Sequence, residues 1–160
     1  MGTFWVAQIQ CETADSSNYA LGVFSLKDAE ALIVTLDTAP SGVYWSLQLG
    51  DVWSRSLPFG ERQTSLNNAQ VKEDADGAIR VVISNRDPGI ANWLDTVGRH
   101  EGTIVFRNYR AKQGIVPRVK KVRFDELKAN LPATTPMVAP RQREAALEHR
   151  RQAVLTLYGE

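Results

Sequence analysis

The sequence predicts a mainly β domain, an antiparallel jelly roll or β-sandwich, that ends in an amphipathic α-helix. Two observations predict the sheets. Short segments are rich in β-branched and aromatic residues or alternate between apolar and polar, and turn-forming residues separate them at close intervals. A third observation predicts the helix, because the C-terminal segment carries its apolar residues at helical spacing.

The expected strands are short and are spread over the first three quarters of the chain. They span residues 3–10, 19–26, 31–36, 43–49, 79–84, 103–109 and 119–124. Asp76-Gly77 predicts a tight turn, since Gly tolerates the positive φ that a hairpin needs, and residues 70–73 and 79–84 are therefore expected to pair as antiparallel neighbours.

Alternation in segment 43–49 predicts which of its side chains face the core. Four apolar residues share one face of the strand, namely Val43, Trp45, Leu47 and Leu49. The opposite face carries Tyr44, Ser46 and Gln48, whose polar groups suit the wall of a cavity or a wet surface.

The C-terminal part is expected to be helical. A short helical turn at 125–130 and a proline-containing connector at 131–140 precede a helix at 141–158, with Pro140 at its first position. Its expected apolar stripe consists of Leu147, Val154 and Tyr158, flanked by Ala146, Ala153 and Leu157. We expect a sandwich at 1–138 and a helix at 139–160 that packs on it, as a single domain.

Composition narrows the classes of function. The chain has 160 residues, 43% of them hydrophobic and 23% charged, which is ordinary for one globular domain. Its net charge of +1 gives no reason to expect nucleic acid or an anionic membrane as a partner. Cys11 is the only cysteine, and there is no long apolar or signal-like segment, so a cytoplasmic location is expected.

The densest cluster of reactive side chains lies between two expected strands, in the loop from Arg86 to Glu101. The candidates for acid–base catalysis are Asp87, Asp95, His100 and Glu101. A structural role is the alternative, with Asp87-Pro88-Gly89 as a turn and Arg86 or Arg99 paired with Asp95.

Ligand contacts are expected from this loop and from two strands. The candidates are Gln48, Trp53, Arg86, Asn92, Trp93 and Arg107. Four polar residues are expected to be partly buried and hydrogen-bonded to one another, namely Asp87, Asn92, Asp95 and Arg107. A short helical turn is expected around residues 92–94.

No metal ion and no cofactor are expected. His100 and His149 are the only histidines, too few for a jelly-roll metal site of two or three imidazoles around one ion when His149 belongs to the terminal helix. Asp74-Ala75-Asp76-Gly77 lacks the later Glu of a calcium loop. The chain also lacks a phosphate-binding glycine loop and a Gly-x-Ser-x-Gly elbow.

Several motifs resemble one bacterial family. They are YWSLQL at 44–49, RQTSLNNAQ at 62–70, DG at 76–77, RDPG at 86–89 and NWLDT at 92–96, with Gly98, Arg107 and the closing helix. They are similar to the domain-of-unknown-function family twelve-fourteen, from about Tyr19 to Tyr158. The resemblance implies a jelly-roll-like domain that in many relatives follows another domain of unknown function in a longer chain.

Two positions depart from the family pattern. Asn85 stands where relatives often carry His, so chemistry that depends on that imidazole would be missing here. Ala139 replaces a common hydroxyl residue, which removes a helix N-cap worth about 1 kcal/mol.

Three classes of function remain open. The leading one is a small-ligand-binding or interaction domain that uses loop 86–101 together with the polar face of segment 43–49. The second is a hydrolase or lyase acting on a small or carbohydrate-like substrate, with Asp or Glu as acid and base and Arg86 or Arg107 holding an anion. The third is a purely structural or assembly domain.

A homo-oligomer, most simply a two-fold dimer, or a missing N-terminal partner domain is also expected. The apolar run at 4–7 and the stripe of the last helix both need a surface to cover them.

Overall fold

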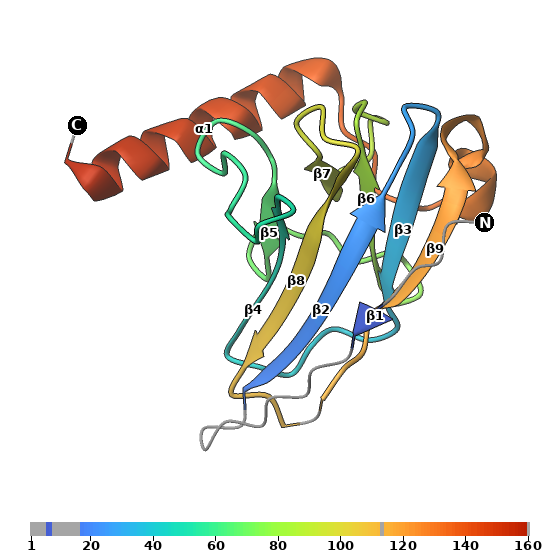
Figure 1. The fold of residues 1–160 in the computed structure, drawn as a ribbon, viewed down its shortest axis with the longest axis horizontal. Helices are drawn as coiled ribbons and strands as arrows, with labels where there is room; N and C mark the ends of the chain where they lie inside the picture. Colours follow the sequence, from blue (N-terminus) through green and yellow to red (C-terminus); the bar gives the residue numbers. More distant parts are fainter. Residues whose placement is uncertain (1–5, 8–16, 113, 160) are drawn as a thin grey trace.

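Two β-sheets pack face to face, and a single long helix extends along one end of them (Figure 1). The computed structural model describes residues 6–7, 17–112 and 114–159. The five-stranded sheet has the order β1-β2-β8-β4-β5 and the four-stranded sheet the order β7-β6-β3-β9. The mainly β fold, with two sheets and a C-terminal helix, is therefore the predicted one.

The five-stranded sheet is antiparallel throughout. Its strands are β1 (Val6–Ala7), β2 (Asn18–Ser25), β4 (Tyr44–Gly50), β5 (Ser65–Asn67) and β8 (Glu101–Tyr109). The four-stranded sheet contains β3 (Glu30–Leu36), β6 (Ile79–Ser84), β7 (Trp93–Asp95) and β9 (Arg118–Arg123). The 3₁₀ turns η1 (Phe124–Glu126) and η2 (Lys128–Asn130) and then α1 (Pro140–Tyr158) complete the chain.

The alternation in β4 faces the predicted way. Trp45, Leu47 and Leu49 are buried between the sheets, whereas Ser46 and Gln48 are half-buried on the outer face. Val43 is an exception, because it precedes the strand and is 72% exposed. Its assignment to the core was wrong, since the sheet has not begun at that residue.

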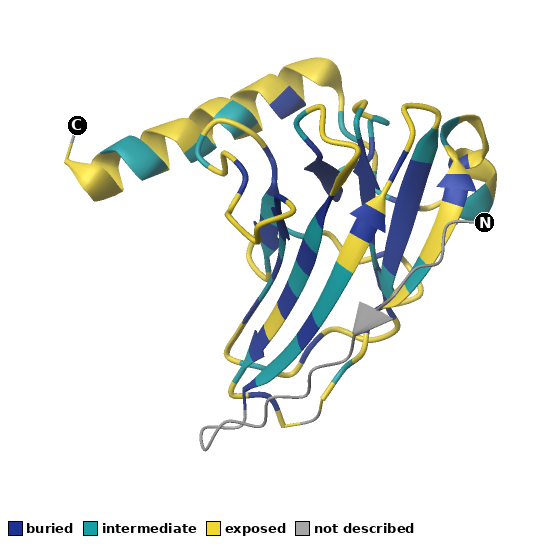
Figure 2. Ribbon diagram, viewed as in Figure 1, coloured by how far each residue is buried: buried dark blue, intermediate teal, exposed yellow. Residues whose placement is uncertain are grey.

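Strand β3 is apolar on both faces because both faces of its sheet are covered. Leu32 and Val34 pack into the core between the sheets, while Ala31 and Ile33 belong to a second apolar cluster that includes Leu127. Figure 2 shows β3 buried along nearly its whole length. A strand with two covered faces reads as a continuous apolar run rather than an alternating one.

One strand pairing departs from the expected antiparallel pattern. The loop after β6 turns the chain back, and β7 then pairs with β6 in parallel, with Val82 opposite Trp93. The helical turn expected at 92–94 is therefore wrong. The hairpin expected at Asp76-Gly77 is also wrong, although Gly77 does adopt a positive φ of 77° in a tight turn, because residues 70–73 form no strand.

Helix α1 is not held by an apolar stripe. Leu147 and Val154 are half-buried, but Leu157 and Tyr158 are 79% and 70% exposed. The most buried residue of the helix is Arg143, at 6% exposure. Figure 2 shows the helix exposed along most of its length, with one buried position near its start. The expected amphipathic stripe was therefore wrong, and polar contacts hold the helix instead.

None of the helices among the described residues combines the length and the apolar character needed to cross a membrane.

Candidate functional site

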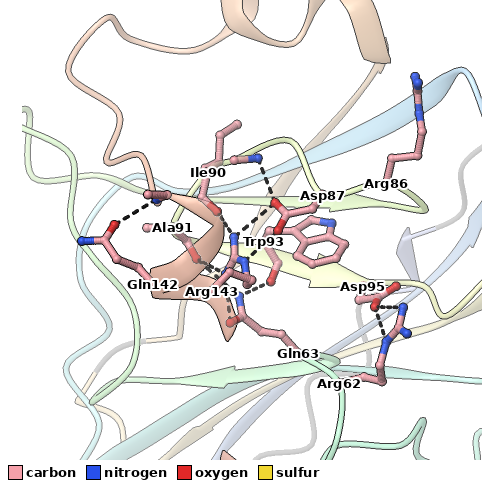
Figure 3. A network of polar contacts seen from close by, with 12 residues as sticks. Arg62, Gln63, Arg86, Asp87, Ile90, Ala91, Trp93, Asp95, Gln142 and Arg143 are labelled. Carbon is pink, nitrogen blue, oxygen red and sulfur yellow. Dashed lines mark hydrogen bonds and ion pairs between the residues drawn. The ribbon is translucent and has the colours of Figure 1, made fainter. Parts of the chain in front are cut away.

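Arg143 is the centre of a buried polar network between the helix and the long loop (Figure 3). Its Nε donates to Asp87 Oδ2 at 2.9 Å, and its Nη2 donates to the carbonyl of Ile90 at 2.5 Å. Nη1 donates to Gln63 Oε1 at 3.0 Å, and the guanidinium lies 5.2 Å from the centre of the Trp93 ring. A guanidinium with this many acceptors can be buried at tolerable cost.

Gln63 extends the network to the next strand. Its amide nitrogen donates to the carbonyl of Trp93 at 2.5 Å, while its oxygen accepts from Arg143. Asp87 also caps its own turn, because its Oδ1 accepts the backbone N–H of Gly89 at 2.8 Å. The loop, the strand and the helix are thus joined through side chains that come from three separate parts of the chain.

Asn92 and Trp93 secure the same loop from the other side. The Asn92 side chain accepts the N–H of Lys72 at 2.8 Å and donates to the carbonyls of Lys72 and Arg80. The Trp93 ring nitrogen donates to Ser84 Oγ at 3.0 Å. Both side chains are buried, so they act as structural ties and present no free surface to a ligand.

Asp95 is buried and fully engaged. Its Oδ2 accepts from Arg62 Nε at 2.6 Å, and its Oδ1 accepts the backbone N–H of Val97 at 2.8 Å. Val97 has a φ of 55°, which is strained for a β-branched residue. Asp95 therefore helps to hold the turn that leads to Arg99.

The predicted partners within the loop are largely wrong. Asp87, Asn92 and Asp95 do not bond to one another, and Asp87 retains 35% side-chain exposure. Arg107 lies on the outer face of the other sheet. Asp95 pairs with Arg62 instead of Arg86 or Arg99, and Figure 3 shows Arg86 pointing away from the network. Arg86 stacks on Phe124, with 4.1 Å to the ring centre.

Three residues of the network were missed from the sequence. Arg62 and Gln63 lie in a motif to which no role was given, and Arg143 was included in a helix expected to pack through aliphatic residues. One signal was present for Arg143: it lies four residues before Leu147, where the buried side of the helix continues.

The remaining catalytic candidates are exposed. His100 Nδ1 donates to the carbonyl oxygen of Leu26 at 2.9 Å and lies 3.9 Å from Asp28 Oδ1. Glu101 opens β8 opposite Ser25. Neither residue shares an enclosed space with Asp87 or Asp95, whose carboxylates are occupied by arginines.

An open hollow of about 540 Å³ lies beside the end of β4, between loop 51–60, the turn before β8 and helix α1. Its walls include Ser56, Phe59, Arg99 and Val154. Gly60 faces Val154 of the helix, and a Cβ built at this position would lie in ordinary contact, 3.4 Å from the Val154 side chain. Through Arg99, the long loop reaches this hollow beside the residues that follow β4.

Positive groups dominate the rim of the hollow. Arg99 makes no ion pair among the described residues, whereas Arg55 is paired with Asp51 at 2.7 Å. Burial raises the pKa of Asp51, but the Arg55 N–H, the Arg55 guanidinium and the Trp53 N–H outweigh it, so that its pKa lies below the usual value. Both members of the Arg55–Asp51 pair are therefore ionised, and their charges cancel. Arg99 then gives the residues that line the hollow a net positive charge.

Arg150 of helix α1 is a second positively charged residue near the hollow, bonded to the lining residue Phe59. It donates to the carbonyls of Phe59 and Ser65 and has no carboxylate partner among the described residues. Burial lowers its pKa, because removing a guanidinium from water is unfavourable. The side of the hollow formed by the helix and loop 51–60 thus favours a negatively charged occupant.

Two of the expected ligand-binding residues flank this hollow. Gln48 donates to Ser56 Oγ at 2.6 Å, which ties the polar face of β4 to the wall. Trp53 is 76% exposed on the same loop but does not line the hollow itself. Within the described part of the chain, no group of three or more His, Cys, Asp or Glu residues is arranged to hold a metal ion.

Fold and network together define a class: a β-sandwich domain whose long polar loop is clamped by an arginine from a C-terminal helix. Residues 25–113 match the model of the family described as "Protein of unknown function (DUF1214)". This match covers more than half of the chain, and the chain belongs to that family.

Two solved structures share the fold. An uncharacterised protein from Burkholderia cenocepacia has 35% sequence identity and a TM-score of 0.66 over 68% of this chain. The VPA0106 protein from Vibrio parahaemolyticus has 15% identity and a TM-score of 0.54 over 67% of the chain. The matched parts cover only 30% and 31% of those longer chains. No curated protein matches this chain.

Proposed function

We propose that this domain is a binding module for a small organic anion, which occupies the hollow beside Arg99. The observation that carries the proposal is Arg99, which lines an open hollow of about 540 Å³ and whose guanidinium forms no ion pair among the described residues. That volume is in the range of sites for small molecules. Phe59 and Val154 offer apolar contact to the carbon skeleton of such a ligand, while Arg99 offers a forked donor to a carboxylate or phosphate.

The carboxylates support binding over acid–base catalysis. Asp87 and Asp95 are held by Arg143 and Arg62, and Asp51 by Arg55. A general acid or base must reach the reacting group, and these side chains are directed into the protein's own ion pairs. The hollow is therefore proposed as a site of recognition alone.

Thermal shift measurements test the proposal with succinate, citrate and glucose 6-phosphate, and with glucose as the uncharged comparison. A ligand that binds only the folded state raises the melting temperature, and the shift grows with the logarithm of its concentration above Kd. We expect at least one of the anions to raise it and glucose to leave it unchanged. Absence of a shift with all three anions at millimolar concentration would contradict the proposal.

Two variants locate the site. Arg99→Gln should remove the shift, whereas Arg141→Gln, which deletes an exposed charge near the start of the helix, should retain it. Calorimetric titration of both variants then gives the affinities. Equal affinity in the two variants would show that the anion binds elsewhere.

A further inference from the structure

The outer face of the five-stranded sheet gathers three tyrosines around an arginine. We call this cluster the tyrosine–arginine face; it consists of Tyr19, Tyr44, Arg107 and Tyr109. The register places Tyr19 directly opposite Arg107 on β2 and β8, and Tyr44 opposite Tyr109 on β4 and β8. Residues opposite one another in an antiparallel pair project to the same side, so the four side chains share one surface.

Aromatic rings hold the Arg107 guanidinium. Its central carbon lies 5.6 Å from the centres of both the Tyr19 and the Tyr109 rings. Among the described residues no carboxylate forms an ion pair with Arg107, which is exposed. By contrast, Arg143 and Arg80, which secure the fold, are each paired with aspartate. The two rings thus hold Arg107, and its guanidinium makes no side-chain hydrogen bond within the part of the chain that the structure describes.

Polar neutral groups continue the face across the sheet. Ser46 lies opposite Arg107, and Asn67 lies opposite Ser46, so a row of hydrogen-bonding groups crosses three strands. Arg110 adds positive charge, with its guanidinium carbon 5.3 Å from the centre of the Tyr109 ring. On the described strands, the only carboxylate that projects to this side is Glu101, at the opposite end of β8.

We infer that the tyrosine–arginine face binds an acidic saccharide, in which a sugar carboxylate contacts Arg107. A planar guanidinium matches a carboxylate with two parallel hydrogen bonds. Tyr44, which is 40% exposed, presents an aromatic surface for the apolar face of a pyranose ring, and Ser46 and Asn67 meet hydroxyl groups. The inference does not depend on the hollow beside Arg99.

Calorimetric titration with a galacturonate hexamer tests this inference, with maltohexaose as the neutral comparison. We expect the hexamer of galacturonate to bind at least tenfold more tightly than maltohexaose. Arg107→Gln should weaken galacturonate binding at least tenfold, and Arg107→Lys should also weaken it, because lysine keeps the charge but loses the forked geometry.

Two controls separate this site from other effects. Arg141→Gln removes one positive charge far from the face, and Arg99→Gln alters only the hollow, so both should bind galacturonate like the unchanged protein. Circular dichroism and the melting temperature verify that each variant is folded. The inference would be overturned if galacturonate did not bind at millimolar concentration, or if Arg107→Gln left its binding unchanged. The surface of a partner protein would then be the alternative occupant of this face.

Discussion

Asp95 is a carboxylate whose burial depends on two partners. Arg62 supplies a charged donor and Val97 supplies a backbone N–H in a strained turn. Asp95→Ala removes both contacts and leaves the Val97 N–H without its acceptor. We expect a loss of about 2 kcal/mol in the free energy of unfolding, less than for a fully buried pair because Arg62 is half-exposed.

His100 provides the matched comparison for Asp95. Its side chain is 59% exposed and makes one close contact, to the Leu26 carbonyl, so His100→Ala should cost under about 1 kcal/mol. Urea unfolding of both variants measures the difference. Equal midpoints would contradict the expectation that the Asp95 contacts stabilise the fold more than those of His100.

Arg143 should be the most sensitive residue of the helix. Truncation in Arg143→Ala leaves Gln63 Oε1 and the Ile90 carbonyl without their donor, and we expect a loss of about 3 kcal/mol. Arg143→Lys should lose less of the free energy of unfolding than Arg143→Ala does. It should still be less stable than the unchanged protein, because a single ammonium cannot reach all of these acceptors. Arg141→Ala, at an exposed position, is the control. Thermal unfolding that ranks Arg141→Ala as equally damaging would contradict the clamp.

The sequence predicted which loop contributes to the polar network, but it did not predict which residues from other parts of the chain bond to that loop. The dense polar spacing of loop 86–101 correctly indicated a cluster of structural hydrogen bonds. The partners lie far away in the chain: Arg62 is 33 residues from Asp95, and Arg143 is 56 residues from Asp87. No local pattern encodes such pairings, because they depend on where the tertiary fold places β5 and α1.

The turn before β6 contains an acid-sensitive ion pair. Arg80 donates to Asp76 and Asp74, and its hydrogen bond to Asp76 lowers the pKa of that carboxyl from 3.8 to about 2. A carboxyl with a depressed pKa in the folded state stabilises the protein above its unfolded pKa. This stability is lost as the pH falls from about 4 through about 2.

A pH series of melting temperatures tests this pair. Asp76→Asn should melt lower at neutral pH and should lose less on acidification from pH 4 to pH 2 than the unchanged protein does. Glu73→Gln, which removes an exposed carboxylate without an ion pair among the described residues, corrects for the general effect of charge. Parallel curves for Asp76→Asn and the unchanged protein would contradict the expectation.

The longer elements were predictable because their signals are local. The strands expected at 19–26, 31–36 and 79–84 agree with β2, β3 and β6 within one residue at each end. Strands β5 and β7 have three residues each, too few to show a period. The parallel pairing of β7 with β6 depends on the path of the loop between them. Apolar–polar alternation in a strand does not reveal that path, so the sequence did not predict the pairing.

At the scale of the whole molecule, several large apolar side chains are left uncovered. Val43, Trp53, Leu157 and Tyr158 are each at least 70% exposed. The apolar run at 4–7 that first suggested an assembly lies mostly outside the described residues. We still expect a two-fold dimer, since a self-complementary patch would cover such groups.

Light scattering at micromolar concentration measures the assembly. A dimer would have twice the chain mass of 17.8 kDa. Tyr158→Ser combined with Leu157→Ser should shift the equilibrium toward the monomer if the end of the helix forms the contact. A constant mass of one chain across a concentration series would contradict the prediction.

The attachment of α1 through arginines also determines how the molecule loses its structure. None of the residues of α1 belongs to either apolar cluster, so the sandwich keeps its core when the helix separates from it. Such a segment can open by itself, at a free-energy cost below that of global unfolding. Amide hydrogens of α1 should then exchange with deuterium well before those of β3 and β6. Exchange in Arg143→Ala should accelerate in the helix while the protection of the central strands remains.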